Sequence, residues 1–232
     1  MISCVLFDLD NTLLLKEPSL PEKIWEVVSS VSPEVSQETV EKAYAASELW
    51  IGKQIQKENE TGVRASDEEF FAGVLSSYRR FLPLNEELTD RLLPVLYGKY
   101  PMEYQVTPHA RETLRYLSEK GYFLGIVSNN HSQVRETLST LELTDYFNSV
   151  IISEEVNLYK PDPKILELAC QNIGVPRGNS IYVGDHPFDV LCAHQAQMPA
   201  VWFPPNPFFE LPEEISPPEY VIHDLEELCA VF

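Results

Sequence analysis

Residues 3–12 read SCVLFDLDNT, a short apolar run that stops at two aspartates. An apolar run of this length without polar alternation is typical of a strand that is buried on both faces of a parallel sheet. Asp8 and Asp10 follow directly, where such a strand reaches the edge of its sheet. We therefore expect a buried parallel strand over residues 3–7, with carboxylates at its carboxyl end.

Further apolar runs repeat this pattern along the second half of the chain. They cover residues 122–127, 149–152 and 180–183. Helical patterns alternate with them, over residues 110–120, 131–141 and 163–173. Because strands alternate with helices, the sequence predicts an α/β fold with a Rossmann-like, doubly wound parallel sheet.

Residues 15–105 differ from the rest of the chain, because they show helical periodicity and no convincing strand. Helix starts are indicated by an initial proline or by typical N-cap residues: Pro21, Ser36, Ser66 and Asn85. We predict a core domain of residues 1–14 and 106–232 that is interrupted by an all-helical domain over residues 15–105. Trp25 and Trp50 are expected in the core of the helical domain.

Residues 203–218, FPPNPFFELPEEISPP, contain too many prolines for regular secondary structure. We expect a loop that crosses the surface and leads into the apolar residues 220–222. A Pro-rich motif that binds a partner is the alternative.

Composition limits the class of protein. With 232 residues, 44% of them hydrophobic, the chain can bury a substantial core. A formal charge of −19 argues against nucleic acid as a partner, because binding to the phosphate backbone needs clusters of Lys and Arg.

No apolar run approaches the ~20 residues that span a bilayer, and no secretory signal is present, so we expect a cytoplasmic protein without a membrane partner. The four cysteines form no CxxC pair and are expected to be buried, reduced thiols.

Carboxylates follow two of the predicted strands. Asp8 and Asp10 follow the first, and Asp185 and Asp189 belong to GDHPFD after residues 180–183. The carboxyl ends of neighbouring parallel strands meet in one crevice, so these acids are expected to lie together. Like charges repel, and Mg²⁺ with its preference for carboxylate oxygens, water and phosphate would offset that repulsion. Capping of the following helix is the alternative role for Asp185 and Asp189.

Candidate phosphate ligands follow other predicted strands. Ser128 and Asn129 lie between an apolar run and a helical pattern, where a hydroxyl and main-chain N–H groups can face a phosphate. Lys160 precedes a proline-initiated helix in KPDP and can act as a point charge on phosphoryl oxygens. An acidic protein that handles phosphate needs such local positive charge.

The order of these motifs resembles that of the haloacid dehalogenase superfamily. The motifs are Asp-x-Asp-x-Thr at residues 8–12, Ser-Asn at 128–129, Lys-Pro-Asp at 160–162 and Gly-Asp-x-x-x-Asp at 184–189. The resemblance covers nearly the whole chain, and the helical insertion is similar to the family's cap domain, which brings specificity to the mouth of the site. Cys192 and Gln197 stand where the family often has small glycines.

The resemblance implies a role for each motif residue. Asp8 would be the nucleophile and a metal ligand, and Asp10 the general acid/base and a metal ligand through its backbone carbonyl. The phosphate would be bound by Thr12, Ser128, Asn129 and Lys160. Asp185 would complete the Mg²⁺ shell, and Asp189 would support that shell or orient Lys160.

The implied activity is that of a Mg²⁺-dependent phosphohydrolase with an aspartyl-phosphate intermediate. Its substrate would be a small phosphorylated metabolite, such as a sugar phosphate, a nucleoside monophosphate or a phospho-acid, and the protein would be a monomer or a homodimer. A 2-haloacid dehalogenase is disfavoured because a departing halide needs no proton from Asp10. A phosphomutase stays open, and so do a phosphonatase, for which Lys53 or Lys57 would form an imine, and a binding protein that has lost activity.

Overall fold

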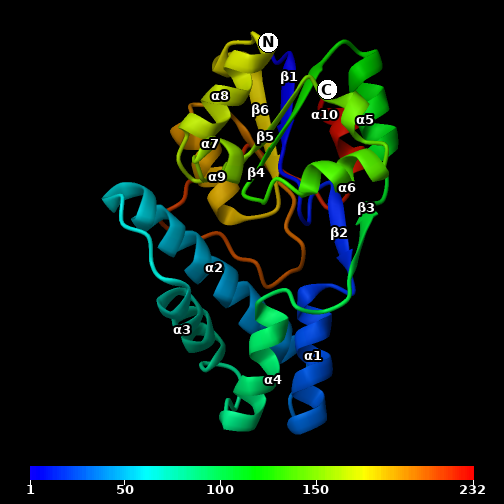
Figure 1. Ribbon diagram of the computed structural model, residues 1–232. Coiled ribbons are helices and arrows are strands. Elements are labelled where there is room, and N and C mark those ends of the chain that lie inside the picture. The colour runs from blue at the N-terminus through cyan, green and yellow to red at the C-terminus, as the bar shows by residue number, and fades with distance from the viewer. The chain divides into compact units, whose positions relative to one another are not determined.

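The computed structural model describes all residues, Met1 to Phe232, and divides into two compact units. One unit consists of Met1–Leu15 and Tyr104–Phe232, and the other of Lys16–Glu103. The colours of Figure 1 show that the blue N-terminal strand lies among the green and yellow strands of the later chain. The first unit is therefore assembled from both ends of the sequence.

The larger unit is built on a six-stranded parallel sheet with the order β5-β4-β1-β6-β7-β8. The strands are β1 (Cys4–Phe7), β4 (Phe123–Ser128), β5 (Ser149–Ile152), β6 (Ser180–Gly184), β7 (Ala200–Trp202) and β8 (Tyr220–Val221). Phe7 pairs with Ile126 on one side and with Val183 on the other. The residues that follow β1, β4 and β6 therefore lie side by side at one edge of the sheet, as the sequence predicts.

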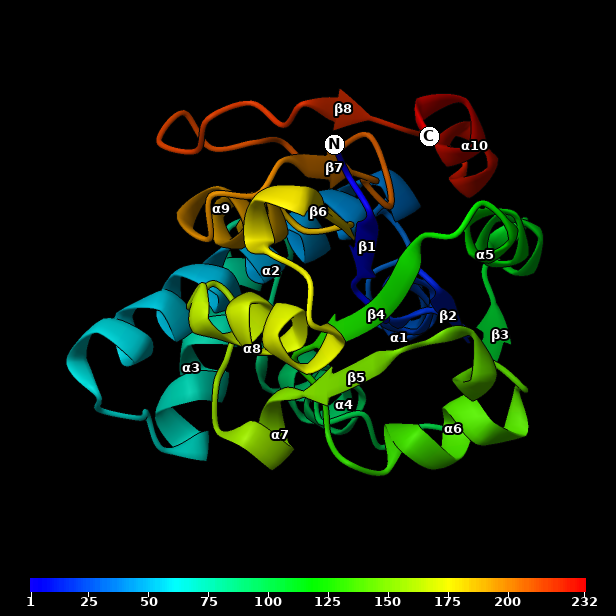
Figure 2. The ribbon, with the colours of Figure 1, turned by 90° about the horizontal axis from the view of Figure 1, so that it is seen from above.

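Helices cover both faces of this sheet. Alternate residues of β1 enter different cores, because successive side chains of a strand point to opposite faces. Val5 and Phe7 pack with α5 (Ala110–Glu119), and Cys4 and Leu6 pack with α8 (Lys164–Ile173) and α9 (Pro187–Gln195). Figure 2 shows α8 and α9 on one side, with α5 and α10 (Leu228–Val231) on the other. The predicted doubly wound α/β fold is thus confirmed.

Short helices complete the unit: α6 (Val134–Thr140), α7 (Ser153–Val156) and the 3₁₀ helices η1 (Thr144–Tyr146), η2 (Arg177–Asn179) and η3 (Leu225–Glu227). Helix α6 begins three residues later than the sequence pattern predicts. The N–H of His131 donates to the side chain of Asn130 at 2.8 Å, and the N–H of Ser132 donates to the Glu154 carboxylate at 2.7 Å. These hydrogen bonds hold residues 131–133 in a turn.

The smaller unit consists of four helices, α1 (Leu20–Val31), α2 (Gln37–Thr61), α3 (Asp67–Tyr78) and α4 (Glu86–Leu96), around their own hydrophobic core. The predicted N-caps are confirmed at Ser36, Ser66 and Asn85, whose side chains each accept a main-chain N–H. Trp50 packs against this core. The expected burial of Trp25 is wrong, because α1 buries Ile24 and Val28 and leaves Trp25 38% exposed.

Two short strands were not predicted. Strand β2 (Leu14–Glu17) pairs with β3 (Glu103–Val106) in a separate two-stranded sheet. Each has four residues of mixed polarity, LLKE and EYQV, and neither contains an apolar run that would predict it. The stretch from 15 to 105 is therefore helical except at its two ends.

The Pro-rich residues 203–218 contain neither helix nor strand, as predicted, and connect β7 to β8. Phe209 and Ile215 anchor this segment because both are 4% exposed. All four cysteines are free thiols; three are buried, but Cys229 is only partly buried, so its expected burial is wrong. None of the helices has the length and apolar character that crossing a membrane requires.

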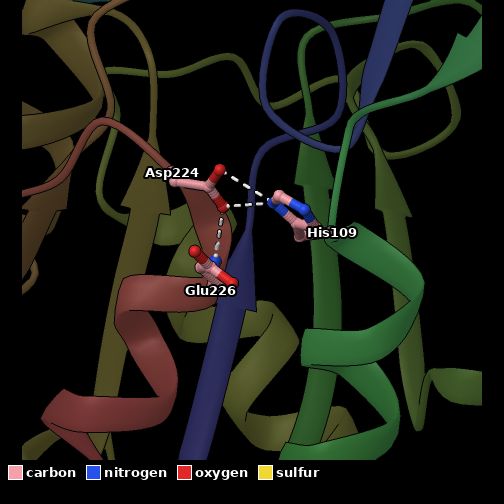
Figure 3. A group of neighbouring side chains, drawn as sticks. All are labelled: His109, Asp224 and Glu226. Carbon is pink, nitrogen blue, oxygen red and sulfur yellow. Dashed lines mark hydrogen bonds and ion pairs between the residues drawn. The ribbon is translucent and has the colours of Figure 1, made fainter.

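A surface contact joins the closing segment to α5. The Nδ1 atom of His109 lies 2.9 and 2.8 Å from the two carboxylate oxygens of Asp224 (Figure 3). Asp224 also accepts the N–H of Glu226 at 2.9 Å and so caps η3. The hydrogen bond that Asp224 accepts from the imidazole, together with the charge of Asp224, raises the pKa of His109 above the ordinary value. The protonated form of the imidazole therefore stabilises this junction more than the neutral form does.

Candidate active site

The turn after β1 fixes Asp8 at the centre of the sheet edge. Its N–H donates to the carbonyl of Val183 at 2.8 Å, which extends the ladder between β1 and β6 by one residue. The chain then turns back, with the N–H groups of Leu13 and Leu14 both 2.9 Å from the Leu9 carbonyl. Asn11 adopts the left-handed conformation, with φ of 57°, which asparagine tolerates better than most residues. Main-chain hydrogen bonds therefore fix the position of the Asp8 side chain.

Three buried carboxylates meet here. Oxygen atoms of Asp8, Asp185 and Asp189 lie within 4.8 Å of one another, and Asp185 accepts a 3.3 Å hydrogen bond from Asn11 Nδ2. Burial and the charges of Asp8 and Asp189 raise the pKa of Asp185 well above its ordinary value. Burial also raises the pKa of Asp8, against the opposing charge of Lys160. Three carboxylates facing one ammonium lack two positive charges, and one divalent cation would supply both.

The ammonium of Lys160 lies at the centre of the acids. Its Nζ lies 2.5 Å from Asp8 Oδ1, 2.8 Å from Asp189 Oδ1 and 2.9 Å from the hydroxyl of Tyr182. Burial alone would lower the pKa of Lys160, but the charges of Asp189 and Asp8 outweigh it and hold that pKa well above the ordinary value. Lys160 is therefore a permanent positive charge beside Asp8.

Asn129 fixes the backbone of Lys160. Its side-chain Nδ2 donates to the Lys160 carbonyl at 3.0 Å, and its Oδ1 accepts the Lys160 N–H at 2.8 Å. Ser128, the last residue of β4, is buried beside it. The side-chain amide of Asn129 thus holds the lysine segment, while its main chain continues the loop after Ser128.

Asp189 contacts two groups at once. One oxygen binds Lys160, and the other accepts the N–H of His186 at 3.0 Å in a capping box at the start of α9. Asp189 therefore both caps α9 and contacts the lysine, so capping does not exclude a place beside Lys160. Gly184 allows this arrangement, because a Cβ atom at that position would lie 2.4 Å from Asp189 Oδ2.

The other predicted residues lie near this cluster without joining it. Asp10 is half-buried on the turn, where it forms a β-bridge with Leu14, and its carboxylate is not part of the three-acid group. Thr12 is fully buried, and its hydroxyl has no hydrogen-bond partner. The structure therefore brings together Asp8, Asp185, Asp189, Lys160 and Asn129 as direct contacts.

Sequence reasoning missed four contributors. Tyr182 belongs to the apolar run of residues 180–183, and an apolar run does not predict that the tyrosine hydroxyl contacts Lys160. Trp202 Nε1 donates to the Asp185 carbonyl at 2.8 Å, and no motif contains it. Gly184 and Asn11 do lie inside the motifs, but their roles depend on close packing and on a left-handed turn.

The sequence and the structure of this chain are similar to those of known hydrolases. Residues 5–203 match the family model described as haloacid dehalogenase-like hydrolase. A glyceraldehyde 3-phosphate phosphatase from Pyrococcus furiosus is 36% identical over 127 residues, which are 53% of this chain and 53% of that protein. An (S)-2-haloacid dehalogenase from Pseudomonas putida is 29% identical, over 53% of this chain and 55% of that protein. The chain thus matches about half the length of each relative.

A solved structure is similar over nearly the whole chain. It is described as a HAD phosphatase from Thermococcus onnurineus, with a TM-score of 0.58 and 29% sequence identity. The match covers 99% of this chain and 97% of that one, so it includes the smaller helical unit as well as the sheet.

Proposed function

The chain belongs to the haloacid dehalogenase-like hydrolase family, and on that premise we propose that it is a Mg²⁺-dependent phosphatase of small phosphorylated metabolites. The observation that carries the proposal is the buried cluster in which Lys160 lies 2.5 Å from Asp8, beside Asp185 and Asp189. Such a cluster places a carboxylate nucleophile next to fixed positive charge, which attack on an anionic phosphate requires. The phosphatase names of two of the similar proteins support the same reaction class.

The donor atoms in this cluster suit magnesium. Asp8, Asp185 and the main-chain carbonyl of Asp10 would hold the ion, with Asp189 supporting them. All are hard oxygen ligands, and the cluster lacks two positive charges. When bound, Mg²⁺ supplies positive charge to the oxygens of the transferring phosphoryl group.

The proposed chemistry uses the chain's own residues in two steps. A carboxylate oxygen of Asp8 attacks phosphorus, the bond from phosphorus to the alcohol oxygen breaks, and Asp10 donates a proton to that oxygen. Asp10 then takes a proton from water, which attacks the aspartyl-phosphate, releases inorganic phosphate and restores Asp8. Lys160 neutralises charge on the phosphoryl oxygens throughout, while Ser128, Thr12 and the main chain at Asn129 complete the phosphate site.

Asp10 favours phosphoryl transfer over dehalogenation. An alkoxide leaving group needs a proton, whereas halide leaves without one, so a half-buried second carboxylate on the turn after β1 has a task only in the first reaction. A dehalogenase remains the second candidate because one of the similar proteins carries that name.

Residues 15–105 are proposed to act as a cap that selects the substrate, with the core domain, 1–14 and 106–232, performing the chemistry. Lys53 and Lys57 are exposed on α2 and could meet a second anionic group of a sugar phosphate, a nucleoside monophosphate or a phospho-acid. The guanidinium of Arg64, near the end of α2, pairs with Glu58 at 2.9 Å. No nucleic-acid partner is proposed, and the protein would work as a monomer or a homodimer.

The test is a screen for release of inorganic phosphate from these three substrate classes, with Mg²⁺ present and with excess chelator. Asp8→Asn serves as the control for contaminating phosphatases. We expect turnover that needs both Mg²⁺ and Asp8. Chloride release from a 2-chloro acid without phosphate release would replace the proposal with dehalogenation, and phosphoryl transfer between two sugar hydroxyls without net phosphate release would indicate a phosphomutase.

A further inference from the structure

Tyr182 lies beneath the proposed site and has no role in the two steps described above. Resting on the proposed function, we propose that Tyr182 is a positioning residue, whose hydroxyl fixes the direction in which the Lys160 ammonium points beside Asp8. Its Oη lies 2.9 Å from Lys160 Nζ and its side chain is 1% exposed.

The orientation of the hydroxyl is set by a second hydrogen bond. Tyr182 donates to the carbonyl of Val127 at 2.8 Å, on the neighbouring part of the sheet. Because its single proton is used there, the hydroxyl can only accept from Lys160. Both strands that supply these groups, β4 and β6, flank β1 and pack on both faces, so the acceptor cannot move far from Asp8.

Lys160 is held at both ends. Asn129 binds its main-chain N–H and carbonyl, at 2.8 and 3.0 Å. At the other end the three N–H donors of the ammonium face three acceptors: two carboxylates and the Tyr182 hydroxyl. The position of the charge is therefore fully determined by the surrounding protein.

The neutral acceptor matters because Asp8 changes its charge during the proposed reaction. When Asp8 becomes an acyl phosphate, its own oxygens lose their negative charge, which then lies on the phosphoryl oxygens and leaves with inorganic phosphate, so the direction of the attraction on the ammonium changes from step to step. Asp189 keeps its charge and draws the ammonium toward α9 in every step. The Tyr182 hydroxyl keeps the same charge in every step, so it holds the ammonium near the phosphoryl oxygens when Asp8 cannot.

The first test is Tyr182→Phe, which keeps the ring and removes only the hydroxyl. We expect kcat for an aryl phosphate to fall about tenfold, equivalent to ~1.4 kcal/mol, with KM changed less than about twofold, because the hydroxyl does not touch substrate. Tyr78→Phe is the matched control. Tyr78 is 1% exposed and its hydroxyl hydrogen-bonds to Ser47 in the smaller unit, so this variant should lose comparable stability and keep wild-type kcat.

The second test does not depend on turnover. Crystal structures in the Asp8→Asn background, which removes the charge of Asp8, should show Lys160 Nζ displaced toward Asp189 when Tyr182→Phe is added, with Asp189 unmoved. If Tyr182→Phe does not fold, 3-fluorotyrosine at position 182 retains the hydroxyl and weakens it as an acceptor, and kcat should fall less steeply than tenfold.

The outcomes separate the two proposals. If the wild type releases no phosphate and Lys160 is nevertheless displaced in the variant, the proposed function is overturned and the positioning role stands. An unmoved Lys160 Nζ, or a kcat for Tyr182→Phe equal to that of Tyr78→Phe, would overturn the positioning role.

Discussion

Replacement of Gly184 by alanine tests whether the geometry around Asp189 is needed. The new Cβ atom would lie 2.4 Å from Asp189 Oδ2, 2.6 Å from its Cγ and 2.7 Å from its Cβ, all too close for a real contact. Gly184 does not have a positive φ, so the cost is steric rather than conformational. The Asp189 side chain must therefore move by about 1 Å to regain an ordinary contact distance.

That movement breaks two interactions. The hydrogen bond to the His186 N–H, now 3.0 Å, caps α9, and loss of such a cap costs about 1 kcal/mol. The ion pair to Lys160, now 2.8 Å, is buried, and removal of one partner of a buried pair costs about 3–5 kcal/mol. Because Asp189 is displaced rather than deleted, we expect about 2–4 kcal/mol of destabilisation and at least a tenfold loss of kcat.

The measurements are urea unfolding and phosphate release, with Gly178→Ala as the matched control. A Cβ at Gly178 would meet nothing within 4 Å, so this variant should equal wild type in both assays. Wild-type stability and activity in Gly184→Ala would refute the proposed packing of Asp189 against β6.

Three further predictions concern other parts of the chain. Gln197 has a φ of 59°, so Gln197→Gly should raise the free energy of unfolding by about 1 kcal/mol, and a lower urea midpoint would contradict this. The pKa of His109 is raised in the folded protein, so its contact with Asp224 contributes its full stabilisation below the unfolded pKa of about 6.5. That stabilisation is lost as the pH rises through the pKa of the folded state. The difference in urea midpoint between wild type and His109→Ala should therefore be larger at about pH 5.5 than at about pH 9, and an equal difference would contradict the contact. Asp10→Asn should slow hydrolysis of alkyl phosphates more than that of aryl phosphates, whose leaving groups need little protonation, and equal losses would remove its role as an acid.

The sheet and the edge at which the acids meet could be predicted because burial on both faces leaves a simple signature. Strand β1 packs against helices on each side, so it reads as an uninterrupted apolar run up to Asp8. The helix starts at Ser36 and Ser66 were predictable for a similar reason, since an N-cap needs a short polar side chain at one defined position.

The remaining features depend on tertiary contacts that no local pattern encodes. Strands β2 and β3 are short and of mixed polarity, and they exist because residues far apart in sequence pair with each other. The late start of α6 depends on a hydrogen bond from Ser132 to Glu154, 22 residues away. The hydroxyl of Tyr182 is hidden in an apolar run, because the periodicity of a strand reports the burial of a side chain and not the polar atom at its tip.

The central claim, that Asp8 is the nucleophile of a phosphatase, is tested most directly by trapping of labelled phosphoenzyme. An aryl phosphate with ³²P, Mg²⁺ and rapid acid quench should give labelled wild-type protein, with the label on the peptide that contains Asp8. The Asp8→Asn variant should give no labelled protein, because the amide has nearly the same shape as the carboxylate but is a poor nucleophile. Label in Asp8→Asn, or label on a different peptide of the wild type, would contradict the account.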